Sequence, residues 1–229
     1  MRFGRTALLI VVLVLGALAL PAPVFAQSTS ELVQETVRNF RGNDHLVTFW
    51  WLPAEFWVAA AREMRKTPGE IEAISDLFDN YTLLGVMDVQ FTPDGKMDAL
   101  STVEIVRRLE VWIDDVPFDV LKQVDPKLQQ MSPELSYAFR VSLAEFGRGL
   151  RLLPFANLDS QARPIVSGSK PGVVRVRYKG EAGAAPLEFW WHAPLTAVAG
   201  SKKCPGSGAP MEASWTHCPW NGKKPEPAK

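Results

Sequence analysis

Apolar and polar positions along the chain follow two different periods, and each period predicts one kind of element. Apolar residues recur at helical spacing after Ser28, after Pro53 and after Thr67, which predicts three short helices. Residues 45–51 are rich in aromatic and β-branched side chains, which predicts a strand between the first two helices. From Tyr81 to position 91 the apolar residues alternate with a period of two, and we therefore expect a longer strand there.

Local capping signals define where these helices begin. Thr67 can cap the third helix, Pro68 suits its first turn, and Glu70 can reach back to complete a capping box. The first helix also follows a serine, and its apolar positions continue until Gly42, where we expect it to end.

The middle of the chain predicts one further strand and one longer helix. Residues 93–96 have the composition of a turn, and alternation over 103–113 predicts a strand that pairs antiparallel with 81–91. Between 125 and 150 apolar residues recur at spacings of three and four, although part of this segment also alternates. We expect a helix in this segment.

A final pair of strands completes the main domain. Residues 173–178 and 187–192 are separated by a turn of small residues and predict a hairpin. The pattern indicates an α+β domain over 27–199, with an antiparallel sheet or sandwich and helices after the first strand. A small C-terminal knuckle at 200–222 and a disordered tail at 223–229 are expected to follow.

The N-terminus has the pattern of a secretory signal peptide. Two arginines precede an uninterrupted apolar run over 7–20, which ends at Pro21 and is followed by a Val-Phe-Ala cleavage sequence. This run is shorter than the roughly 20 residues that a transmembrane helix needs. We therefore expect residues 1–26 to be removed, and the mature protein to be periplasmic or secreted, with no stable membrane span.

The charge of the mature chain makes nucleic acid an unsuitable partner. The full chain has 25 basic and 25 acidic residues, and the signal peptide removes two basic ones, which leaves 23 against 25. A net charge near minus two lacks the basic excess of a nucleic-acid-binding protein. The partners that we expect instead are another protein of the cell envelope or a small ligand.

Two short C-terminal segments share one plan. Residues 204–208 and 218–222 both read cysteine, proline, any residue, a small polar residue, glycine. They resemble the two Cys-Pro-x-Cys-Gly knuckles of a zinc ribbon, in which four thiolates hold a structural zinc. Cys204 and Cys218 match the first ligand of each knuckle, and Ser207 and Asn221 stand where the second ligands belong. The resemblance therefore implies a degenerate ribbon that has lost half of its metal site.

This resemblance implies that a disulfide has replaced the metal. Two thiolates on one zinc lie within roughly 4 Å of each other, so little further closure joins Cys204 to Cys218. Export to an oxidising compartment lets the bond persist, and we expect no metal or other cofactor. A metal site that adds His192 or His217 to the cysteines is the alternative.

Chemistry-bearing residues are few, and no catalytic residue can be assigned. The chain contains no Gly-x-Ser-x-Gly or His-Glu-x-x-His motif and no phosphate-binding glycine loop. His45, beside Asp44, is the best candidate for a catalytic base, and Asp114-Asp115 reads as a turn. The preferred hypothesis is an exported, non-catalytic binding or structural protein of the cell envelope, and the alternative is a hydrolase of unrecognised type.

Two tryptophan pairs supply the candidate binding surface. Adjacent residues on a strand face opposite sides, so one member of Trp50–Trp51 and one of Trp190–Trp191 can face outward. Exported carbohydrate-binding modules present aromatic platforms of this kind, although core packing is the simpler explanation for most of the tryptophans. The outward members are therefore the residues on which we expect a partner or ligand to bind.

Overall fold

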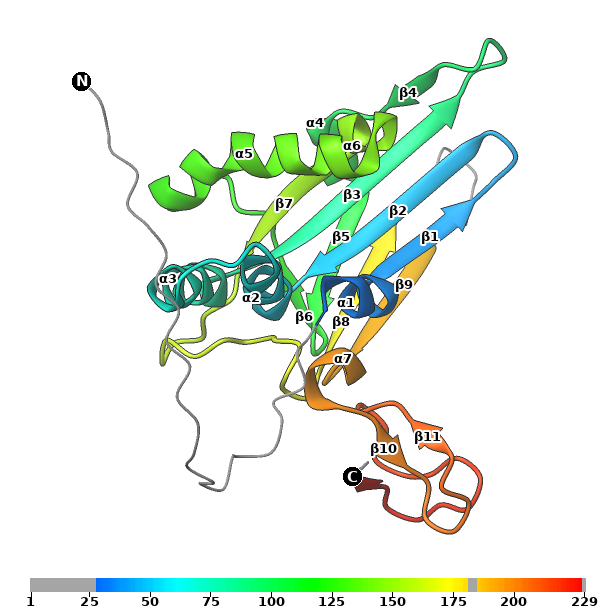
Figure 1. Cartoon of the computed structure of the whole chain (residues 1–229). Helices are drawn as coiled ribbons and strands as arrows, with labels where there is room; N and C mark the ends of the chain where they lie inside the picture. Colours follow the sequence, from blue (N-terminus) through cyan, green and yellow to red (C-terminus); the bar gives the residue numbers. More distant parts are fainter. Residues whose placement is uncertain (1–27, 181–184, 228–229) are drawn as a thin grey trace, which may run out of the picture.

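The computed structural model describes residues 28–180 and 185–227, so the signal peptide expected over 1–26 lies outside the described residues. Two antiparallel sheets and a set of helices form the main body, and a small disulfide-bonded unit follows it (Figure 1). The α+β class expected from the sequence is confirmed. The helices are α1 (Thr29–Thr36), α2 (Ala54–Glu63), α3 (Pro68–Asp79), α4 (Thr102–Arg108), α5 (Pro126–Leu143), α6 (Glu145–Gly149) and α7 (Thr196–Ala199).

The first sheet is built around its longest strand, β3. The strand β2 pairs along one side of β3, while β4 and β7 pair with different halves of the other side. β1 extends the sheet beyond β2, and every pairing is antiparallel. The five strands are β1 (Val37–Arg41), β2 (His45–Leu52), β3 (Tyr81–Phe91), β4 (Met97–Ala99) and β7 (Arg151–Ala156).

The second sheet has the order β6-β5-β8-β9 and packs on one face of the first sheet. Its strands are β5 (Leu109–Ile113), β6 (Val116–Phe118), β8 (Gly172–Tyr178) and β9 (Leu187–Ala193). The expected hairpin of β8 and β9 is confirmed. Phe49 of β2 forms the contact between the sheets, because its ring centroid lies 5.3 Å from that of Tyr178 and 5.2 Å from that of Phe189.

Helices cover the opposite face of the first sheet. Trp50, which follows Phe49 and therefore points the other way, packs edge-on against Phe56 of α2 and Phe139 of α5, both at 5.2 Å. Trp57 of α2 stacks on Phe78 of α3 at 4.4 Å. The domain thus has three layers, in the order helices, first sheet, second sheet, and both faces of β2 are buried.

The first helix ends earlier than the sequence predicts. α1 stops at Thr36, and the next five residues form β1, which pairs with β2 from Val37 opposite Trp50 to Arg41 opposite Leu46. The expectation of a helix up to Gly42 is wrong. Val37 and Phe40 are three positions apart and so continue the helical spacing of α1, but pairing with β2 satisfies the backbone of the whole segment.

Residues 103–113 are not one strand, and their expected pairing with β3 is also wrong. They contain α4 and then β5, which pairs with β6 and β8 in the second sheet. A capping box starts α4, because the Ser101 hydroxyl accepts from the amide of Glu104 and the Glu104 carboxylate accepts from the amide of Ser101. Val103 is exposed to solvent, so the alternation that includes it marks no buried sheet face.

The C-terminal unit has its own small sheet and core. The strands β10 (Lys202–Lys203), β11 (Pro210–Met211) and β12 (Glu226–Pro227) form the sheet, with β10 between the other two. Cys204, Met211 and Cys218 form a buried cluster separate from the main core. The expectation of a disordered tail from position 223 is wrong up to 227, because β12 pairs with β10. The last two residues, 228–229, lie outside the described residues.

Candidate functional site

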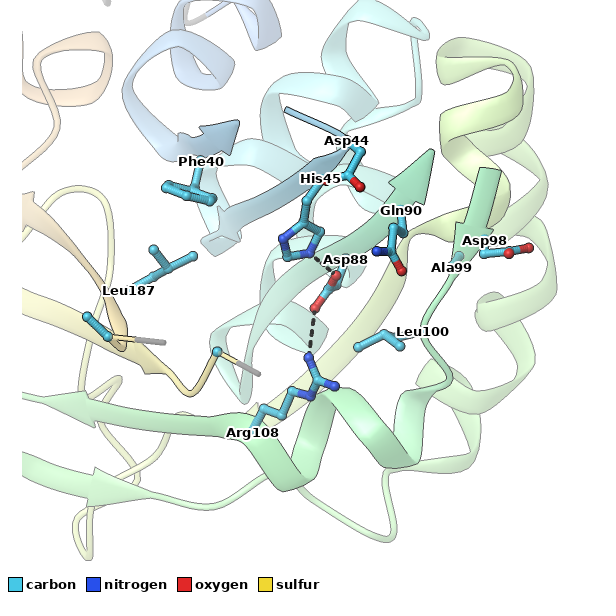
Figure 2. Close-up of a pocket in the computed structure, with 12 residues that line it drawn as sticks. Phe40, Asp44, His45, Asp88, Gln90, Asp98, Ala99, Leu100, Arg108 and Leu187 are labelled. Carbon is cyan, nitrogen blue, oxygen red and sulfur yellow. Dashed lines mark hydrogen bonds and ion pairs between the residues drawn. The ribbon is translucent and has the colours of Figure 1, made fainter. Parts of the chain in front are cut away.

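Asp88 of β3 is a buried carboxylate between the two sheets, with only 3 % of its surface exposed. Its Oδ2 accepts a 2.6 Å hydrogen bond from the hydroxyl of Tyr178 on β8. Its Oδ1 lies 2.6 Å from Nε2 of His45 on β2. A guanidinium nitrogen of Arg108, the last residue of α4, lies 3.8 Å from Oδ2 (Figure 2). Donors from both sheets and from α4 therefore converge on Asp88.

These donors offset the cost of removing a carboxylate from water. Burial, together with the hydrogen bond to Asp88, raises the pKa of Tyr178 above its ordinary value, so its hydroxyl stays protonated and remains a donor. Because an ionised carboxylate only accepts hydrogen bonds, Nε2 of His45 carries the proton that faces Asp88. This arrangement leaves Nδ1 of His45 as the ring nitrogen available for a ligand or a water molecule.

The network opens into a cavity of about 310 Å³ at one end of the space between the sheets (Figure 2). His45 and Arg108 lie in its wall with 32 % and 27 % of their side chains exposed. The other described lining residues are Phe40, Asp44, Asp88, Gln90, Asp98, Ala99, Leu100, Gly180, Ala185 and Leu187. The cavity therefore combines an apolar part with groups of both charges, which suits a small polar ligand.

Sheet register explains why these side chains share one face. His45 pairs with Gln90, and Gln90 pairs with Asp98, so the three residues form a row across β2, β3 and β4. Asp88 is two positions before Gln90 on β3 and points to the same side. Residues that are distant in sequence are in this way brought to one end of the sandwich.

The sequence placed His45 in the site but named the wrong partner. His45 bonds Asp88, 43 positions later in the chain, whereas Asp44 lies at the rim of the same cavity. The missed residues are Asp88, Arg108 and Tyr178. A lone acid inside the apolar strand β3 is a signal for a buried network, but its partners depend on pairings that no local pattern reveals.

The two tryptophan pairs behave differently. Trp190 is 42 % exposed and Trp191 is fully buried, so the second pair has the expected outward member. Trp50 and Trp51 are both buried, and they are therefore not part of a binding surface. The physical reason is that the helices cover one face of β2 and the second sheet covers the other. Trp51 instead donates its indole hydrogen to the Thr82 hydroxyl at 2.9 Å.

The expected disulfide between Cys204 and Cys218 is present, with a sequence separation of 14 and both side chains buried. Asn221 donates through Nδ2 to the sulfur of Cys204 at 3.4 Å and to the carbonyl of Pro205 at 2.6 Å. Ser207 instead accepts from the amide of Ala209. Of Ser207 and Asn221, it is thus Asn221 that lies against the sulfur pair.

The two knuckles have the same backbone hydrogen bonds. In each, the cysteine amide donates to the carbonyl five positions later, from Cys204 to Ala209 and from Cys218 to Lys223. In each, the glycine four positions after the cysteine donates back to the cysteine carbonyl. The sequence repeat is therefore also a structural repeat around the disulfide.

The remaining candidate residues form no site with one another. Asp114 and Asp115 have φ values of +48° and +64° and form the turn between β5 and β6, as expected. His192 and His217 are exposed. Across the described ranges, no group of three or more histidine, cysteine or acidic side chains is placed to hold a metal ion.

Comparison with known proteins identifies no relative, because no protein family, curated protein or solved structure matches this chain significantly. Within the described residues, no helix has both the length and the apolar character required to span a bilayer. The disulfide indicates a location outside the reducing cytoplasm, because such bonds form and persist in oxidising compartments.

Proposed function

We propose that the protein is an exported, non-catalytic ligand-binding protein of the cell envelope, located in the periplasm or secreted. The pattern of residues 1–26 and the disulfide of the C-terminal unit support export. The C-terminal unit, a degenerate zinc ribbon in this proposal, stabilises the end of the chain without metal. The cavity beside Asp88 supplies the binding site.

The observation that carries the binding proposal is the pair of partly buried side chains, His45 and Arg108, held on Asp88 in the cavity wall. Arg108 has five N–H donors, and only one of its nitrogens faces Asp88, at the long distance of 3.8 Å. The rest of the guanidinium is available to an anionic group of a ligand. The described lining contains no serine, threonine or cysteine that His45 could activate, which favours binding over covalent catalysis.

The other lining residues define the ligand further. Asp44 lies at the rim and can hold an amine, and Phe40 and Leu187 offer apolar contact on the opposite side from Gln90 (Figure 2). A ligand with an acidic group, a basic group and an apolar part satisfies all of these residues. Free amino acids and short peptides have this chemistry and fit a cavity of about 310 Å³.

Calorimetric titration of the mature protein with amino acids and dipeptides tests this proposal. We expect saturable binding by zwitterionic ligands and weaker binding by their amidated or acetylated forms. Arg108→Gln should weaken binding about tenfold or more, since a charge-assisted hydrogen bond is lost. Arg107→Gln is the matched control, because Arg107 is the exposed neighbour on the same helix. Failure of all zwitterions to bind, or equal effects of both variants, would reject the proposal.

A second function is favoured by the His45–Asp88 pair itself. A carboxylate that orients a histidine is the arrangement of a general base, and Nδ1 of His45 faces away from Asp88 (Figure 2). In a hydrolase, this nitrogen would activate a water molecule and Arg108 would stabilise the developing oxyanion. Turnover of ester or peptide substrates that is abolished by His45→Ala and retained by His217→Ala would establish this hydrolase and exclude the non-catalytic proposal.

Export is tested separately by expressing the full chain in a bacterium that has an outer membrane. We expect the protein in the periplasm or the medium, with Gln27 as its first residue. Its intact mass should rise by two hydrogen masses on reduction. Retention of residues 1–26 in a cytoplasmic product with two free thiols would contradict the export proposal.

A further inference from the structure

The outward face of the second sheet carries a row of large side chains on neighbouring strands. Pro117 of β6 pairs with Trp112 of β5, Trp112 pairs with Arg175 of β8, and Arg175 pairs with Trp190 of β9. Directly paired residues project to the same side of a sheet. This face is opposite to the one that packs on the first sheet, and it lies away from α2 and α5 (Figure 1).

The row forms a continuous aromatic and cationic surface. The guanidinium of Arg175 lies over the ring of Trp112, 4.5 Å from its centroid. Nε of Arg175 is buried without a hydrogen-bond partner among the described residues, while 35 % of the side chain remains exposed. Trp190, on the other side of Arg175, is 42 % exposed. Packing on Trp112 thus orders Arg175 beside an accessible indole ring.

The charges on this face compensate one another. Arg175 lies 3.6 Å from Asp115, Arg177 lies 3.6 Å from Glu188, and Lys179 lies 2.6 Å from Glu110. In each pair a basic residue of β8, or Lys179 directly after it, contacts an acidic residue on a neighbouring strand or turn. The face is therefore rich in hydrogen-bonding groups but has no excess of either charge.

We propose that this face, here called the Trp190 platform and consisting of Trp112, Arg175, Trp190 and the flanking ion pairs, binds a neutral polysaccharide. The C–H faces of pyranose rings stack on exposed indole rings, and sugar hydroxyls bond to charged side chains. An anionic polymer would need cationic side chains on this face that are not paired with acids. An apolar protein surface would remove the ion pairs from water, which costs free energy. A neutral, hydroxyl-rich chain satisfies both the ring of Trp190 and the paired charges around it.

Titration of the mature protein with neutral oligosaccharides, monitored by tryptophan fluorescence and calorimetry, tests this site. The probes are cellohexaose, maltohexaose, chitohexaose and mannohexaose, with polygalacturonate as an anionic comparison. We expect at least one neutral probe to bind and to protect a tryptophan from quenching by acrylamide. Trp190→Ala should weaken that binding about tenfold or more. The matched control is Trp220→Ala, since Trp220 is 65 % exposed on the C-terminal unit.

Several results would overturn the proposal. These are no binding of any neutral probe, binding of polygalacturonate alone, or equal loss in Trp190→Ala and Trp220→Ala. The quenching experiment uses the unaltered protein, so absence of protection by every neutral probe overturns the proposal even if Trp190→Ala does not fold. Arg108→Gln should leave oligosaccharide binding unchanged, which separates this site from the cavity beside Asp88.

Discussion

The hydroxyl of Tyr178 on the second sheet donates a 2.6 Å hydrogen bond to the carboxylate of Asp88 on the first sheet, across a sequence separation of 90 residues. The nearby contacts between the sheets are aromatic, as in Phe49 against Tyr178 and Phe189. One side chain, Tyr178, therefore takes part both in the aromatic core and in the polar network of the cavity.

Replacing Tyr178 with phenylalanine should destabilise the protein by about 1–3 kcal/mol. The substitution keeps the ring but removes one donor from a buried carboxylate, which is left partly unsatisfied. Denaturant unfolding monitored by tryptophan fluorescence measures the change. Tyr137→Phe is the control, because Tyr137 is 63 % exposed on α5 and should lose almost nothing. Equal stability of the two variants would show that the bond between the sheets contributes little.

The capping box of α3 should make stability depend on pH in the acidic range. Hydrogen bonds from the amide and hydroxyl of Thr67, with a smaller contribution from Lys66, lower the pKa of Glu70 from 4.5 to about 2. A depressed pKa gives stabilisation that is present above the unfolded value and is lost as the pH falls through the folded value. The free energy of unfolding should therefore fall between pH 4.5 and pH 2, and Glu70→Gln should reduce this fall.

Glu72→Gln is the matched control for this pH dependence, because Glu72 is an exposed residue of the same helix. Carbon-detected NMR of the carboxyl groups gives the pKa of Glu70 directly. An ordinary pKa for Glu70, or a pH profile that Glu70→Gln leaves unchanged, would contradict the role assigned to the capping box.

The crossing between α5 and α6 should tolerate no side chain at Gly147. A Cβ atom at this position would overlap the carbonyl oxygen of Phe139 and lie 2.6 Å from Cα of Arg140. Both neighbours are backbone atoms, so Gly147→Ala must displace one helix, and we expect a loss of about 1–3 kcal/mol in thermal or denaturant unfolding. Gly69→Ala has open space around its Cβ in α3 and should cost nothing.

The resemblance to a zinc ribbon predicts that the lost metal site can be restored. Ser207→Cys combined with Asn221→Cys supplies two thiolates besides Cys204 and Cys218, in knuckles with equivalent backbone hydrogen bonds. We expect the reduced double variant to bind one zinc ion per chain, measured by metal analysis after dialysis, and each single variant to bind it much more weakly. Absence of zinc from the reduced double variant would contradict a ribbon origin.

Local signals in the sequence are sufficient for the elements that depend on neighbouring residues. The capping box at Thr67 and Glu70 predicts α3 correctly, and alternation predicts the hairpin of β8 and β9. The structure shows the same kind of capping box at Ser101 and Glu104, a signal that sequence reasoning misses because the alternation to which the exposed Val103 contributes favours a strand. Local periodicity does not reveal which residues are exposed to solvent. The boundary between α4 and β5 depends on this exposure.

The site is less accessible to sequence reasoning than the fold. His45 stands out because histidines are few, but its carboxylate comes from β3, and Arg108 and Tyr178 enter from α4 and the second sheet. The exposure of each tryptophan likewise depends on how the layers pack. Trp50 is covered by α2 and α5, and the sequence of β2 does not predict that these helices pack there. Pairings between distant strands determine both outcomes.

The burial of Asp88 has a consequence for anyone who alters the ligand preference of this cavity. Substitutions of Asp88 or Tyr178 that change the ligand selectivity will also lower the yield of folded protein, because the hydrogen bond between these residues holds the two sheets together. Phe40 and Leu187 also line the cavity but take no part in the hydrogen bonds to Asp88. Engineering by library selection should therefore begin at this apolar rim and leave the carboxylate and its donors intact.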